Sequence, residues 1–94
     1  MEHVYIVTNA AWPEHVKIGL TTKAPAKRLS QYNTGSPHRD YVMEYQQPIA
    51  DSRALEAEVH ANLRDMGIES RNEWFKLPVP LAVSMVATAV SDLD

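Results

Sequence analysis

The 94-residue sequence contains no cysteine, which excludes a disulfide framework and any metal site built on thiolates. It also lacks a basic excess, because 9 Lys and Arg residues stand against 12 Asp and Glu residues, for a formal net charge of -3. Bulk charge therefore argues against a general nucleic-acid binder, although a local basic patch stays possible. The sequence has no glycine-rich phosphate loop, no Ser/His/Asp order and no zinc-type histidine pair.

Long hydrophobic runs are missing as well. The longest apolar stretch, 79–90, is too short to span a bilayer and is interrupted by Ser84 and Thr88. No secretory signal segment is present, so we expect a cytoplasmic protein that makes no membrane contact. The length of 94 residues and the hydrophobic fraction of 45% predict one folded domain over 1–94, with its core within 4–77.

Two stretches near the start, 3–9 and 15–19, alternate in period two, which is typical of β-strands with one apolar face. Trp12-Pro13 between them supplies turn chemistry. If these strands pair as a hairpin, Tyr5 and Lys17 stand on one face, close enough for a phenol to meet an ammonium. Such a pair is either an ordinary solvent-facing contact or part of a chemical site.

The remaining chain predicts helices alternating with short strands. Asp51 or Ser52 is expected to cap the strongest helix and Gly67 to end it. The expected elements are a helix over 26–32, a strand over 40–47, a helix over 53–66, a short strand or extended turn over 73–77 and a last helix over 79–92. This order predicts an α+β fold with a small, mainly antiparallel, three-stranded sheet flanked by helices.

Candidate chemistry lies on the two internal helices. Glu56 and His60 are four residues apart and so share one helix face, where they could hold a divalent metal or simply form a solvated surface. Arg28 could grip a phosphate in a fork geometry, or could be an ordinary surface arginine. Trp74 and Phe75 are expected to be core residues.

Taken in order, these segments resemble the GIY-YIG nuclease superfamily and, within it, the T5orf172-like branch. The resemblance covers about 4–77, and two strands carry its short motifs: 4–6 for the first, and 16–19 for the second, in which Lys17 replaces the usual tyrosine. The next matches include Thr21, Lys27-Arg28-Leu29 and Asn33-Thr34-Gly35. The helix segment 54–60 and the closing motif 73–75 complete an ordered set of five.

The resemblance implies a metal-dependent endonuclease that hydrolyses DNA phosphodiester bonds with one Mg²⁺ or Mn²⁺ ion. Glu56 would bind the ion, and Arg28 would neutralise charge on the phosphoryl oxygens. Tyr5 would help to deprotonate the attacking water, with Lys17 favouring the phenolate. His60 would orient a metal-bound water or relay a proton. Substrate contacts are expected from the matched residues Thr21, Lys27 and Asn33.

The sequence departs from the superfamily at His3, where the first motif usually begins with glycine. Superfamily nucleases also commonly use an appended module for DNA affinity, so we expect DNA or another nucleic acid as partner, aided by a protein partner or a homodimer. A second hypothesis is a catalytically inactive module that binds nucleic acid or a protein. A third is a small interaction protein that self-associates through its last helix, with Leu81 and Val90 at the contact.

Overall fold

In the computed structural model the predicted hairpin forms the middle of an antiparallel sheet. The structure describes residues 2–22, 24–35, 41–68, 70–71 and 74–93. Strand β1 (Glu2–Asn9) pairs with β2 (His15–Thr21). Asn9 shapes the connection between them, because its carbonyl accepts from the Trp12 N–H at 2.9 Å and its side chain accepts from the Ala11 N–H at 2.9 Å. These local bonds satisfy the backbone at the turn.

The sheet has five strands among the described residues, in the order β3-β1-β2-β5-β4. The added strands are β3 (Tyr41–Ile49), β4 (Ser70–Arg71) and β5 (Trp74–Lys76), and every pairing is antiparallel. The antiparallel α+β architecture is confirmed, but the predicted number of three strands is wrong. Strand β5 lies within the short strand or extended turn predicted over 73–77, whereas β4 was not predicted, because two residues are too few to show a period-two pattern.

Three helices complete the fold: α1 (Pro25–Gly35), α2 (Ser52–Asp65) and α3 (Val79–Leu93). Of the two expected caps for α2, Asp51 is the one used, since its side chain accepts from the Ala54 N–H at 3.1 Å. The α2 helix ends as predicted, with Gly67 just beyond it at φ 70°, a conformation that favours glycine. Helix α1 extends three residues beyond the predicted end at 32.

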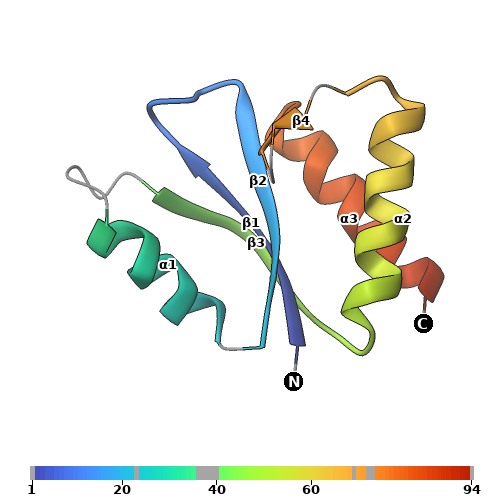
Figure 1. Ribbon diagram of the computed structural model, residues 1–94, viewed down its shortest axis with the longest axis horizontal. Helices are drawn as coiled ribbons and strands as arrows, with labels where there is room; N and C mark the ends of the chain where they lie inside the picture. The colour runs from blue at the N-terminus through green and yellow to red at the C-terminus, as the bar shows by residue number, and fades with distance from the viewer. Residues whose placement is uncertain (1, 23, 36–40, 69, 72–73, 94) are drawn as a thin grey trace.

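Helices cover both faces of the sheet: α1 lies on one face, and α2 and α3 lie on the other (Figure 1). The residues of β1 are therefore buried on both sides, with Val4, Tyr5, Ile6 and Val7 at most 1% exposed. The main core lies between the sheet and the α2/α3 layer, and its members are Val4, Ile6, Val16, Ile18, Leu55, Val59, Leu63, Phe75, Leu77, Ala82, Val86 and Ala89.

Strand β3 forms one edge of the sheet, a position that tolerates Pro48 because proline has no N–H to donate to a neighbouring strand. A β-bulge interrupts its pairing with β1: Ile6 lies opposite Tyr45, but Val7 lies opposite Met43, so that Glu44 has no partner position. The bulge turns Met43 toward the α1 face and leaves Tyr45 packed against the main core. The Glu44 carboxylate accepts a hydrogen bond from the Thr8 hydroxyl at 3.1 Å.

The N-terminus of α2 is tied directly to β1, because Glu2 Oε2 accepts from the Ser52 N–H at 2.9 Å. A carboxylate at this position also suits the positive end of the helix. Helix α3 packs against α2 and β3. In the described part of the chain, none of the helices has both the length and the apolar character needed to cross a membrane.

Candidate active site

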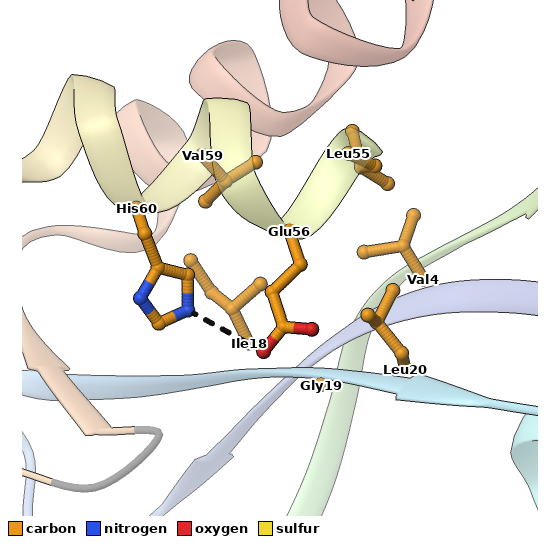
Figure 2. A pocket seen from close by; sticks show the side chains of 8 residues that line it. All are labelled: Val4, Ile18, Gly19, Leu20, Leu55, Glu56, Val59 and His60. Carbon is orange, nitrogen blue, oxygen red and sulfur yellow. Dashed lines mark ion pairs between the residues drawn. The ribbon is translucent and has the colours of Figure 1, made fainter. Parts of the chain in front are cut away.

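An open pocket lies between α2 and the second half of β2. Its walls are mostly apolar, and its polar side chains are Glu56 and His60 (Figure 2). The lining residues are Val4, Ile18, Gly19, Leu20, Leu55, Glu56, Val59 and His60. A surface pocket with apolar walls and a few converging polar groups is the usual form of a ligand site.

Glu56 and His60 occupy one face of α2, as their spacing predicted. His60 Nε2 lies 4.0 Å from Glu56 Oε1, and the two side chains are 44% and 58% exposed respectively. The His60 ring also meets Phe75 edge-on, with ring centroids 5.6 Å apart. Figure 2 shows the Glu56 side chain extending from α2 toward β2 beside Gly19. The carboxylate is thus held over β2 while open to solvent.

Tyr5 lies against the same point of β2 from the opposite face of the sheet. Val4 and Ile6 belong to the core under α2 and α3, so the alternation of the strand places Tyr5 on the α1 face. Tyr5 pairs with Gly19, and its ring covers the glycine so closely that a Cβ there would lie 2.5 Å from Cζ of the ring. The tyrosine is only 1% exposed, so the solvent-facing interpretation is wrong for this residue.

Lys17 shares the α1 face with Tyr5, as the hairpin predicted, but its pair lies two positions further along the strands. The register places Lys17 opposite Val7 and Tyr5 opposite Gly19. A diagonal pair of this kind has its Cα atoms about 7–8 Å apart, which long side chains can still bridge. Lys17 Nζ lies 5.9 Å from the ring centroid of Trp74, within the range of a cation–π contact.

Among the described strands, the pairing of β2 with β5 ends at Lys17. Strand β5 pairs with β2 only at His15, Val16 and Lys17. From Ile18 onward, the outer edge of β2 has no partner among the strands that the structure describes. Gly19 lies in this stretch, with Tyr5 against one face and the Glu56 pocket on the other. Only the backbone of one strand therefore separates the two sets of side chains.

The residues predicted on and before α1 lie in different settings. Thr21 ends β2 opposite His3. Lys27 is exposed in the first turn of α1; Arg28 belongs to the same helix, but its side chain is outside the described part of the structure. Asn33 accepts from the Tyr41 N–H at 3.1 Å and donates to the Tyr41 carbonyl at 3.4 Å, which joins α1 to β3.

Sequence analysis missed a group of rings on the α1 face. Trp74 was expected in the core with Phe75, but adjacent residues of a strand face opposite sides. Phe75 is 2% exposed in the main core, whereas Trp74 faces the other way and contacts Trp12 and Tyr41. The alternation of the short strand was the signal that could have separated them. Glu73, the first residue of the closing motif 73–75, lies outside the described residues.

The pocket is compatible with a divalent cation held mainly by one carboxylate. No group of three or more His, Asp or Glu side chains converges within the described ranges. Mg²⁺ nevertheless commonly binds through one or two carboxylates while keeping several waters and taking substrate phosphates as ligands. Glu56 is exposed enough to offer its oxygens in this way, and His60 stands beside it. The donor set therefore fits Mg²⁺ or Mn²⁺ bound together with a phosphate.

The fold and the pocket define a small α+β domain with a polar surface site over one strand of its sheet. The chain belongs to the T5orf172 domain family, whose family model matches residues 2–92. This membership confirms the resemblance seen in the sequence and is consistent with the GIY-YIG superfamily. It associates the chain with endonuclease-like, nucleic-acid-related proteins. Searches among curated proteins and among solved structures found no match.

Proposed function

We propose that this domain is a divalent-metal-dependent endonuclease that hydrolyses phosphodiester bonds of DNA. The observation that carries the proposal is that two predicted site residues, Tyr5 and Glu56, lie beside Gly19 on opposite faces of β2. Tyr5 packs against Gly19 from one face, and Gly19 lines the pocket that holds Glu56 on the other. Family membership supports the same substrate class.

Each side chain has a role that suits its chemistry. Glu56, with His60 beside it, would hold the cation, which supplies charge stabilisation at the scissile phosphate when bound. Tyr5 would accept the proton of the attacking water. A phenol has an ordinary pKa of about 10, so it needs a nearby positive charge to act near neutral pH. Lys17, on the same face, would provide that charge, and Arg28 would stabilise the phosphoryl oxygens.

The remaining predicted residues divide between substrate and scaffold. Thr21 ends β2, and Lys27 lies in the first turn of α1, the next element of the chain. Both side chains would contact the DNA backbone. Asn33 was predicted as a third substrate contact, but its paired hydrogen bonds with Tyr41 support a positioning role for the end of α1. Because the net charge is -3, affinity for DNA would depend on this local surface and on a protein partner or a second copy.

The test is nicking of supercoiled plasmid by the purified protein with Mg²⁺ or Mn²⁺, compared with Glu56→Gln. The variant keeps the size of the side chain and removes its charge, so we expect metal-dependent nicking to be lost. Glu58→Gln is the matched control, because it removes the same charge from the same helix two residues away and should retain activity. Equal nicking by Glu56→Gln and the unchanged protein would overturn the assignment of the metal ligand.

The burial of Tyr5 favours a second candidate function, a module that binds nucleic acid or a protein partner without cutting. A general base needs access to water, and Tyr5 is 1% exposed. For this candidate we expect DNA binding without nicking under any metal condition, and unchanged binding in Tyr5→Phe. Nicking that Tyr5→Phe abolishes would decide for the enzyme.

A further inference from the structure

Four aromatic side chains gather on the α1 face of the sheet, near the connection between β1 and β2. We call Trp12, His15, Tyr41 and Trp74 the aromatic cluster. Trp12 meets His15 edge-on, with ring centroids 5.2 Å apart, and tilts against Trp74 at 5.5 Å. Tyr41 lies 6.3 Å from Trp74. These separations fall within the usual range for interacting aromatic rings.

The aromatic cluster is not part of the main core. Its members come from the connection after β1 and from β2, β3 and β5, and all belong to the side of the sheet opposite α2 and α3. Trp12 is 42% exposed, and the other three rings are only partly buried. Large aromatic rings that a fold leaves partly open are more informative than scattered aliphatic residues, because they mark binding surfaces.

A positive charge accompanies the rings. Lys17 pairs directly with Trp74 across β2 and β5, and its Nζ lies 5.9 Å from the Trp74 ring centroid. Aromatic faces next to a cation are the combination by which proteins hold single-stranded nucleic acid: the rings stack on bases and the cation meets the phosphates. A purely apolar protein partner would gain nothing from this lysine.

We propose that the aromatic cluster binds an unpaired nucleobase of a single-stranded DNA segment by stacking, with Lys17 against the adjacent phosphate. This inference rests on the proposed function, which makes DNA the ligand, and it adds the structural class of substrate. In a continuous duplex each base face is covered by its neighbours, so a flat ring cannot reach one without unstacking. Single strands, flaps and unpaired ends offer these faces freely.

The position of Lys17 links the aromatic cluster to the candidate active site. On β2 it lies between His15 of the cluster and Gly19, beside which Tyr5 and Glu56 lie. A strand anchored at the rings can therefore continue along β2 toward its edge beyond Lys17. The Glu56 pocket lies on the opposite face of β2, so the strand would pass around this edge for its next phosphates to reach Glu56.

Intrinsic fluorescence offers a direct measurement, because the sequence has only two tryptophans and both belong to the aromatic cluster. We would titrate the protein, in the presence of a metal chelator to prevent cleavage, with three probes. These are a short oligodeoxythymidylate, an abasic chain of the same length and a relaxed closed-circular plasmid. Stacking predicts strong quenching of tryptophan fluorescence by the oligodeoxythymidylate, and little by the other two at equal phosphate concentration.

Variants of Trp12 separate stacking from general apolar contact. Trp12→Leu keeps an apolar side chain but loses the flat ring, and should weaken binding of the oligodeoxythymidylate by about tenfold. Trp12→Phe keeps a ring and should bind nearly as tightly as the unchanged protein. Met66→Ala removes a side chain of similar exposure, 47%, at the end of α2 and serves as the control. Because Trp12→Leu loses part of the signal, affinities are measured by anisotropy of a labelled oligonucleotide.

The outcomes separate this inference from the proposed function. Selective binding of the oligodeoxythymidylate without metal-dependent cleavage of either this oligonucleotide or supercoiled plasmid supports stacking and removes the nuclease. Plasmid nicking without selective binding of the oligodeoxythymidylate contradicts the stacking inference and supports the proposed endonuclease. Equal quenching by the abasic chain, unchanged affinity in Trp12→Leu or the absence of any binding overturns the inference. Binding of a protein in preference to every DNA probe also overturns the stacking inference.

Discussion

The ring of Tyr5 occupies the space that a side chain at residue 19 would need. The two residues face each other across β1 and β2, and both the hydroxyl and Cζ of Tyr5 lie where a Cβ of Gly19 would stand. The glycine is required here by close approach and not by backbone conformation. Gly19 of the second motif thus leaves the space that the ring of Tyr5, from the first motif, occupies.

Adding a methyl group at residue 19 tests whether the ring of Tyr5 requires a glycine there. Gly19→Ala should destabilise the protein by about 1–3 kcal/mol, because the whole ring of Tyr5 must move. In a Tyr5→Leu background, the same substitution should cost less, since the ring is absent. A double-mutant cycle in urea measures the coupling between the two residues. Equal costs in both backgrounds would show that the ring does not set the requirement for glycine.

His60 is expected to support activity through its nitrogen and not through packing. His60→Phe retains a ring beside Phe75 and removes Nε2, which lies 4.0 Å from Glu56. Thermal stability should therefore change little, while metal-dependent cleavage should fall about tenfold, as is usual when a partner of a metal ligand is lost. Cleavage is measured over a range of Mg²⁺ concentrations, and His60→Gln, which restores a polar group, should recover part of the loss. Full activity of His60→Phe would remove the histidine from the site.

Asn33 should contribute to stability more than to DNA affinity. Asn33→Ala removes both hydrogen bonds to the Tyr41 backbone and should cost about 1–2 kcal/mol of unfolding free energy. Asn33→Asp keeps the oxygen that accepts from the Tyr41 N–H. Its unfolding free energy should therefore lie between those of Asn33→Ala and the unchanged protein. Urea unfolding and DNA binding are measured on the same preparations. If Asn33→Ala binds DNA more weakly but unfolds at the same urea concentration as the unchanged protein, Asn33 contacts the substrate.

Tyr45 should make the fold sensitive to alkaline pH. Burial raises the pKa of Tyr45 above its ordinary value of about 10. Between the ordinary and the raised pKa the folded protein holds the proton more tightly than the unfolded chain, so this contribution is complete below about pH 10 and is lost as the pH rises further. Unfolding free energy should therefore fall less steeply above pH 10 in Tyr45→Phe than in the unchanged protein. Parallel pH profiles would contradict this assignment.

Much of the fold could be predicted from local patterns. The hairpin followed from period-two alternation and the α2 helix from its spacing, its cap and Gly67, because these signals are complete within a few neighbouring residues. Strand β5 lies within the short strand or extended turn expected over 73–77, but the two-residue strand β4 was too short to give such a pattern, and the strand count failed. The bulge at Glu44 was also beyond reach, since it depends on how β3 meets β1.

The candidate site likewise has features that local sequence patterns predict and features that they do not. The neighbouring positions of Glu56 and His60 follow from helix spacing alone, and the shared face of Tyr5 and Lys17 follows from hairpin pairing. The burial of Tyr5 could not be read from alternation, because it requires a second layer on the α1 side. The contact of Trp12 with Trp74 joins segments far apart in sequence, which no local pattern reports.

The uneven pairing of β2 has a consequence for motion. Among the described strands only Lys17 is paired on both sides: His15 and Val16 pair with β5, whereas Ile18, Gly19 and Leu20 pair with β1. Backbone hydrogen bonds with fewer neighbours open at lower free energy, so amide exchange should be faster around Gly19 than in the middle of β1, which is paired with both β2 and β3. Local opening there would separate Gly19 from the ring above it and admit water to the Tyr5 hydroxyl. A stretch of β2 paired on one side among the described strands would then admit solvent to a phenol that is 1% exposed in the folded sheet.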